Sequence, residues 1–321
     1  MNNHDGPSHG LKSKTIKSVI RNKVNEWLAS IEDEDLRKLC QKEAIVTGGC
    51  IASMLLGEEV NDFDIYFRTK ATVAKVANYY VKKFQAGRQA QGGVPVNIYV
   101  EETTDSEGKD RVRIVVKSAG VAGEGQKQDY QYFEHGNDHD AGEYVNEAFD
   151  PLSDVKDVAD KVAEEHPKYS PVFLSSNAIS LRGKVQLILR FYGDPDTIHG
   201  NYDFVHCMNF WEGDPSKLTL KAEALESLLS KSLVYRGSKY PLCSVIRSRK
   251  FIERGWRINA GQYLKMAMQI SALDLTDHTV LEEQLTGVDV AYFAEVIEKI
   301  KEKDPAKVDA AYLTEIIDRM F

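Results

Sequence analysis

The sequence predicts an α+β protein in which strands and helices share the first two thirds of the chain and helices alone form the last third. Short apolar runs at 44–47, at 62–68 and within 172–191 have the length of strands. Segments with apolar residues three and four positions apart, at 13–31 and within 259–321, have the period of helices. With 321 residues, the chain is long enough for two domains or for one domain with a helical extension.

Composition and charge are those of an ordinary globular protein, with 42% hydrophobic and 28% charged residues. No apolar run is long enough to cross a bilayer and no signal-peptide pattern is present, so we expect no membrane contact. The four cysteines lack Cys-x-x-Cys spacing, which argues against a zinc site or a disulfide framework and predicts a cytoplasmic location. The net charge of −8 argues against a protein coated in nucleic-acid-binding surface, so any such contact has to be local.

A strand, a tight turn and a helix are predicted around a double glycine. The apolar run 44–47 ends in Gly48 and Gly49, and residues 50–56 have helical spacing until Gly57. Two glycines allow the backbone to approach a ligand closely, and a helix start offers free N–H groups and the positive end of a dipole to a phosphate. The turn therefore predicts a phosphate site.

Two aspartates follow on the next predicted strand. Residues 62–68 alternate, so Asp62 and Asp64 project from one face while Phe63 and Ile65 point to the other. Mg²⁺ is usually held by one or two carboxylates plus substrate phosphates, an arrangement that serves nucleotidyl transfer with a two-metal clamp. The alternative interpretation is a glycine turn followed by an acidic edge strand.

The order Gly48-Gly49 and then Asp62-x-Asp64 resembles the head domain of the DNA polymerase beta-like nucleotidyltransferases. The bacterial poly(A) polymerases and tRNA CCA-adding enzymes are the most similar branch. This resemblance implies a nucleotidyltransferase head, built as a mixed sheet with helices, followed by an all-helical neck and body. It also implies Mg²⁺ or Mn²⁺ as cofactor, a nucleoside triphosphate (NTP) as substrate, and RNA as the partner that accepts the nucleotide.

The middle of the chain departs from a compact head of that family. Two apolar runs, 94–100 and 111–116, predict a β-hairpin, and 129–133 predicts a third strand. The His/Asp cluster at 135–140 has spacings a metal could use, but a solvated loop is the preferred interpretation because no apolar frame holds it. Further elements are predicted as helices at 36–40, 71–84, 152–166, 218–233, 262–273, 289–303 and 305–320, and as strands at 172–174, 178–181, 185–191 and 204–210.

Two more positions take roles from the resemblance. The strand position that usually supplies a third carboxylate carries Gln186, whose amide brings no charge. Asp203 stands at the place of the family's Asp in an Arg-Arg-Asp-Phe element, with Asn201 and Tyr202 in place of the arginines. In the family this Asp meets the sugar of the nucleotide or the metal site. The alternative is an Asp that caps a buried strand.

The segment 240–258 resembles the neck helix of the same branch, with Pro-Leu, an arginine-rich helix and a Gly-aromatic-x-Ile ending. Such a basic cluster can neutralise a triphosphate or an RNA backbone, and the alternative is a helix face paired with acids. The family's base-reading acids are replaced by Lys239 and Tyr240, and its arginine after the double glycine by Ala52. Base choice and CCA addition therefore do not carry over. Side chains expected to contact the nucleotide's phosphates are Ser53, Arg68, Lys184, Arg190, Arg247 and Lys250.

The expected organisation is N-terminal helices over 1–42, a nucleotidyltransferase head over 43–215 with a β-rich insertion at 85–150, and a helical neck and body over 216–321. The expected reaction transfers NMP from an NTP to a hydroxyl, with an RNA 3′ end as the first candidate acceptor and Asp62, Asp64 and Asp203 as catalytic residues. Two alternatives stay open. The same head acts on a protein or a small molecule, or it has lost catalysis and binds a nucleotide, nucleic acid or protein.

Overall fold

The computed structural model describes residues 10–90, 97–105, 108–117 and 168–275, together with residues 277, 280, 284, 312, 314, 315 and 318. The expected strand at 129–133, the His/Asp cluster at 135–140 and the helices at 152–166 and 289–303 lie outside these residues. Within the described part, no helix combines the length and the apolar character needed to cross a bilayer.

A seven-stranded mixed sheet forms the centre of the molecule, in the order β5-β6-β7-β2-β1-β8-β9. The β2–β7 pair is parallel and the other pairs are antiparallel. The strands are β1 (Ile45–Thr47), β2 (Phe63–Tyr66), β5 (Pro171–Leu174), β6 (Ala178–Leu181), β7 (Val185–Ile188), β8 (Phe210–Glu212) and β9 (Lys217–Thr219). The α+β class with a mixed sheet is therefore confirmed.

Amphipathic helices cover this sheet because their apolar stripes share one core with it. The helices are α1 (Ser13–Ala29), α2 (Glu34–Glu43), α3 (Gly49–Leu56) and α4 (Lys70–Ala90). Trp27 of α1 is fully buried, packs 6.2 Å from the Phe67 ring and donates from Nε1 to the Tyr80 hydroxyl at 2.8 Å. The predicted cover of N-terminal helices is confirmed.

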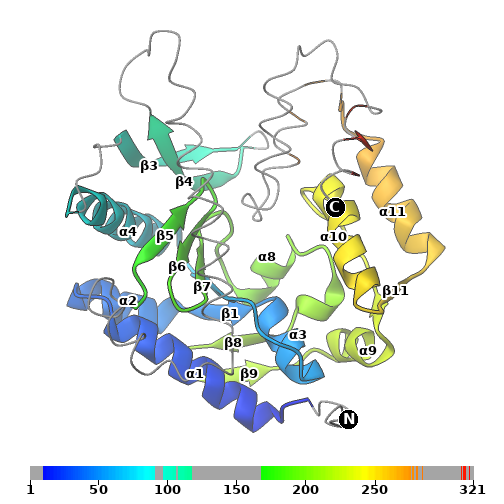
Figure 1. The fold of residues 1–321 in the computed structure, drawn as a ribbon, viewed down its shortest axis with the longest axis horizontal. Coiled ribbons are helices and arrows are strands. Elements are labelled where there is room, and N and C mark those ends of the chain that lie inside the picture. The colour runs from blue at the N-terminus through cyan, green and yellow to red at the C-terminus, as the bar shows by residue number, and fades with distance from the viewer. Residues whose placement is uncertain are drawn as a thin grey trace, which may run out of the picture.

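The predicted hairpin is formed by β3 (Asn97–Thr104) and β4 (Asp110–Lys117), which pair in antiparallel register along their whole length. Its apolar side chains Ile98, Val112 and Ile114 are buried in the main core. Figure 1 shows the strands of the hairpin beside α4. The insertion therefore contributes to the core.

The expected strand over 204–210 is wrong. The segment makes a short 3₁₀ turn, η1 (Val205–Cys207), and only its last residue, Phe210, begins β8. The physical reason is that Phe204, Val205 and Phe210 enter three different apolar clusters, which a straight strand could not reach. A short helix that was not predicted, α8 (Pro195–His199), precedes it.

The C-terminal part contains α9 (Ala222–Ser230), α10 (Pro241–Glu253) and α11 (Ala260–Ile270). The predicted helix at 218–233 is shorter than expected because 217–219 pairs with β8 as strand β9. Two short strands, β10 (Ser232–Leu233) and β11 (Arg257–Ile258), pair in parallel between the helices.

A buried histidine lies where α10 meets the head. The His206 ring is 4.6 Å from the Phe251 ring and 4.5 Å from the Trp256 ring, and it is 1% exposed. Among the described residues, neither of its ring nitrogens has a hydrogen-bond partner. Burial, reinforced by the positive charge of Arg254, lowers the pKa of His206 to about 3. Burial also lowers the pKa of His199 on α8 to about 4.

We expect the free energy of unfolding to fall as pH drops below 6.5. The reason is that His206 and His199 then become protonated in the unfolded chain but stay neutral in the folded protein, where their pKa values are lower. At pH 5 each of the two histidines should contribute a loss of about 2 kcal/mol. Urea unfolding of wild type and His206→Phe between pH 7 and 4.5 measures this loss. The phenylalanine fits the aromatic surroundings and should remove about half of the pH dependence. If the unfolding free energies of wild type and His206→Phe changed equally with pH, His206 would not have the lowered pKa assigned to it.

Candidate active site

A glycine in a backbone conformation that other residues rarely adopt joins β1 to α3. Gly48 has φ 98° and ψ −153°, and its N–H donates to the Cys207 carbonyl at 3.1 Å. A Cβ on Gly48 would stand 3.0 Å from Asp64 Oδ2 and 3.5 Å from the Tyr202 hydroxyl. A Cβ on Gly49 would meet nothing within 4 Å. The first glycine therefore lets a carboxylate approach the backbone, and the second leaves the start of α3 open.

The two predicted aspartates lie together at this turn. The antiparallel register sets Asp64 opposite Thr47, one residue before Gly48, and β2 begins directly after Asp62. Burial raises the pKa of the Cys50 thiol well above its ordinary value, and the charges of Asp64 and Asp62 raise it further. Both carboxylates therefore act on the first turn of α3, where the helix dipole favours negative charge. Asp64 is half-buried and Asp62 is exposed.

Gln186 stands beside Asp64 in the sheet, because the parallel pairing of β2 with β7 aligns these two residues. Among the described residues, no three His, Cys, Asp or Glu side chains gather as a metal-ligand set. Two carboxylates and an adjacent amide oxygen nevertheless suit Mg²⁺ or Mn²⁺ when substrate phosphates complete the shell. A Cβ at Gly48 would stand only 3.0 Å from Asp64 Oδ2, and this close approach of a carboxylate to the backbone also fits a ligand-binding cradle.

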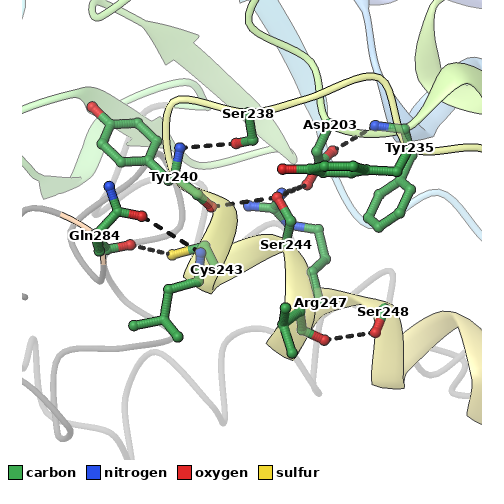
Figure 2. Close-up of polar contacts among 12 residues, drawn as sticks. Asp203, Tyr235, Ser238, Tyr240, Cys243, Ser244, Arg247, Ser248 and Gln284 are labelled. Carbon is green, nitrogen blue, oxygen red and sulfur yellow. Dashed lines mark hydrogen bonds and ion pairs between the residues drawn. The ribbon is translucent and has the colours of Figure 1, made fainter. Parts of the chain in front are cut away.

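Asp203 lies near the same turn but is held by α10 (Figure 2). Its Oδ2 accepts from the Arg247 guanidinium and from Ser244 Oγ at 3.1 Å, and its Oδ1 accepts from the Phe204 N–H at 2.9 Å. Burial raises the pKa of the Cys207 thiol, with further contributions from the charges of Asp203 and, more weakly, Asp64. Cys207 therefore lies close to both carboxylates.

The arginines of the neck-like helix mostly contact acids. Besides the Arg247–Asp203 pair, Arg249 Nε lies 2.9 Å from Glu253, and Arg254 pairs with Glu58. Arg257 lies beyond the helix and donates to the Ser230 carbonyl at 3.4 Å. Of the two interpretations of this basic cluster, the contacts favour a helix face paired with acids.

The other residues expected to contact phosphate are spread over the head. Arg68 pairs with Glu212 and lies two residues beyond the end of β2, whereas Asp64 is the second residue of that strand. Arg190 is in a buried ion pair with Asp105. Lys184 donates to the Val60 carbonyl at 3.0 Å, in the loop before Asp62.

Ser53 and Lys250 complete the expected set. Ser53 lies one turn along α3 from Gly49 and is partly exposed, and Lys250 is exposed near the end of α10. Of the whole set, Gly48, Gly49 and Ser53 share an element with the turn, whereas Arg68 and Arg190 make ion pairs elsewhere.

Sequence reasoning missed two groups that frame the turn. The Tyr202 hydroxyl donates to the Tyr66 hydroxyl at 3.0 Å, and burial raises the pKa of Tyr202 well above its ordinary value. Thr47 Oγ1 donates to the Asn209 carbonyl and lies 2.8 Å from His199 Nε2. The hydroxyl has a single proton, so we assign the donor hydrogen of that second bond to His199. The only sequence signal was the replacement of the family's arginine by Tyr202.

Comparison with known proteins identifies the family. The sequence family Gad2, described as "Gabija anti-defense 2 family protein", matches residues 18–231. The chain belongs to the Gabija anti-defense 2 family. A curated relative named "Gabija anti-defense 2", from Bacillus phage SPbetaL7, is 19% identical over 282 residues, which cover 87% of this chain and 50% of the relative. The chain thus spans about half the length of that member, and the sequence motifs had indicated a nucleotidyltransferase without indicating this family.

Two solved structures of other proteins are distantly similar. The "Thermotoga maritima CCA-adding enzyme complexed with tRNA_CCA" is 15% identical with a TM-score of 0.36, covering 92% of this chain and 53% of that one. A "tRNA-processing enzyme (apo form I)" is 12% identical with a TM-score of 0.33, covering 91% of this chain and 59% of that one. At these TM-scores the likeness supports no conclusion about the function of this chain.

The two glycines should respond differently to alanine. Gly48→Ala combines a disfavoured φ with a close contact to Asp64, so we expect it to lower the free energy of unfolding by about 2 kcal/mol or more. Gly49→Ala has open space and should change it by less than about 0.5 kcal/mol. Urea unfolding of both variants measures the difference. Equal destabilisation would mean that Gly48 is not strained by its surroundings.

Gln186→Glu would place a third carboxylate beside Asp64 with little change of side-chain size. Repulsion should lower the Tm without a divalent cation, and binding of Mg²⁺ or Mn²⁺ should raise the Tm more than in wild type. Thermal unfolding with and without each cation gives both shifts. Gln41→Glu, on the exposed face of α2, serves as the matched control. A metal response no greater than that of the control would argue against a cation at this position.

Proposed function

We propose that the chain is a metal-dependent nucleotidyltransferase whose activity serves to counter the defence named Gabija. The observation that carries the proposal is the meeting of two carboxylates with a glycine turn. Asp64 Oδ2 lies 3.0 Å from the point where a Cβ at residue 48 would stand, and the adjacent helix start at Gly49 is open. The family description supports the biological setting.

In the proposed reaction, the N–H groups at the start of α3 would hold the triphosphate, and Asp62 and Asp64 would hold the divalent cation. When bound, that cation neutralises charge on the phosphates and makes the α-phosphorus easier to attack. The acceptor's hydroxyl oxygen forms a new ester bond to the α-phosphorus, the bond to the β-phosphate breaks, and pyrophosphate leaves. The hydroxyl proton passes to solvent or to a nearby base. Asp203 positions the sugar of the nucleotide or completes the metal shell.

The nature of the acceptor separates two versions of the proposal. An RNA 3′ end is the acceptor that the neck-like helix suggests. A protein of the opposed defence, or a small molecule, is favoured by the contacts of that helix, because Arg247, Arg249 and Arg254 already neutralise acids. The net charge of −8 points the same way, since a long RNA backbone would be repelled.

The aspartates test the chemistry. Asp64→Asn and Asp62→Asn should each lower nucleotidyl transfer by roughly two orders of magnitude, the scale seen on removing one electrostatic stabiliser of a transition state. Both variants should stay folded, because loss of one charge relieves repulsion within the pair. The assay follows label from α-³²P NTPs and Mg²⁺ into RNA or into lysate protein. Asp35→Asn, an exposed acid on α2, is the control.

Each outcome selects an interpretation. Label at RNA 3′ ends supports the first acceptor, and label on protein supports the second. If ATP and Mg²⁺ bind to wild type but are not consumed with any acceptor, the head is a nucleotide-binding module and the catalytic proposal fails. Full activity of either aspartate variant would also reject it.

A further inference from the structure

A buried acid at the tip of the β3–β4 hairpin connects three distant segments. Asp105 Oδ2 accepts from Arg190 Nη2 at 2.7 Å and from Lys239 Nζ at 2.6 Å. The exposed fractions of the three side chains are 1% for Asp105, 3% for Arg190 and 13% for Lys239. On the same hairpin, Asp110 pairs with Lys70 at 3.4 Å and is 62% exposed.

On one side, this cluster is anchored to the sheet. Arg190 follows β7, the strand that carries Gln186 beside Asp64, and its backbone N–H donates to the Asn177 carbonyl at 3.2 Å. The hairpin also contacts Asn177 directly, because Arg111 Nη2 of β4 donates to the Asn177 side chain at 3.0 Å. The hairpin tip is therefore placed relative to the strands that hold the candidate active site.

On the other side, the cluster reaches the two residues directly before α10. Lys239 lies two residues before the helix, and Tyr240 precedes it directly and accepts from Arg190 Nε at 3.4 Å through its hydroxyl. Within the helix, Ser244 Oγ lies 3.3 Å from the Tyr240 carbonyl and 3.1 Å from Asp203 Oδ2. Figure 2 shows Tyr240, Ser244 and Arg247 along this helix, with Asp203 facing it.

The first two turns of α10 thus connect the contacts of Asp105 with those of Asp203. From Pro241 to Arg247 an α-helix rises about 9 Å, so a shift at its start is carried to the groups that hold Asp203. A buried ion pair is weak evidence for added stability, because desolvation offsets the attraction. Removing one partner is different, since Arg190 and Lys239 would be left as buried charges and would turn outward. The main consequence would be a displaced helix start.

We propose that Asp105 is a positioning residue that holds the start of α10 against the head and, through Ser244 and Arg247, sets the position of Asp203. A competing tether also acts on the helix start. Gln284 Nε2 donates to the Lys239 carbonyl at 3.0 Å, and Cys243 Sγ donates to the Gln284 carbonyl at 2.8 Å. If that tether were sufficient, the loss of Asp105 would leave the helix in place. The catalytic part of this inference rests on the proposed nucleotidyl transfer.

The test compares Asp105→Asn with Asp110→Asn, two charge-removing changes on one hairpin. Hydrogen exchange of the amides in Pro241–Glu253 should become about tenfold faster in the first variant and stay unchanged in the second. Amides of β1 and β2 should keep their wild-type exchange in both, which separates a displaced helix from general unfolding. In the transfer assay, Asp105→Asn should lower kcat with little change in KM for the NTP, and Asp105→Glu should recover part of the loss.

Should Asp105→Asn fail to fold, Lys239→Gln provides a milder change, because Arg190 still pairs with the acid. It should raise exchange in α10 by a smaller factor. The inference is overturned if α10 exchanges at the wild-type rate in Asp105→Asn and Lys239→Gln, or if Asp110→Asn accelerates it equally. Hydrogen exchange does not depend on turnover. A wild-type protein that transfers no nucleotide would therefore reject the proposed function, while the exchange of α10 would still decide the role of Asp105.

Discussion

The absence of a side chain at Gly48 is the constraint on which the rest of the site depends. The residue adopts a φ of 98°, which turns the chain from β1 into α3, and its missing side chain lets Asp64 Oδ2 approach the backbone closely. A Cβ at this position would make a tight contact of 3.0 Å with that oxygen. The strand order then sets the neighbours of Asp64, because β1 and β7 flank β2 and bring Thr47 and Gln186 to either side of this residue.

Charge is distributed so that most basic groups near the site have an acidic partner. Arg247 pairs with Asp203, Arg254 with Glu58, and Arg190 with Asp105. These pairs join the head to α10 and to the hairpin, so they serve as connections between elements. A chain with a net charge of −8 can in this way carry an arginine-rich helix without offering a broad basic surface.

Much of the fold was predictable because its signals are local. The strand and helix around Gly48 and Gly49, the alternation at Asp62 and Asp64, and the hairpin pairing all follow from periodicity within a few residues. The segment 204–210 was predicted as a strand because it is apolar. It turns instead, since its side chains enter three separate clusters made by distant parts of the chain.

By itself, the sequence determined the α+β class, the glycine turn and the two aspartates that follow it, since each depends on residue type and short spacing. Tertiary structure alone decided the partners of the charged side chains. Nothing near Asp105 in the chain indicates that its carboxylate meets Arg190 and Lys239, and nothing near Arg247 indicates Asp203. The reason is physical: an ion pair is set by distance in space, and segments far apart along the chain come within 3 Å only after the sheet, the hairpin and α10 have packed.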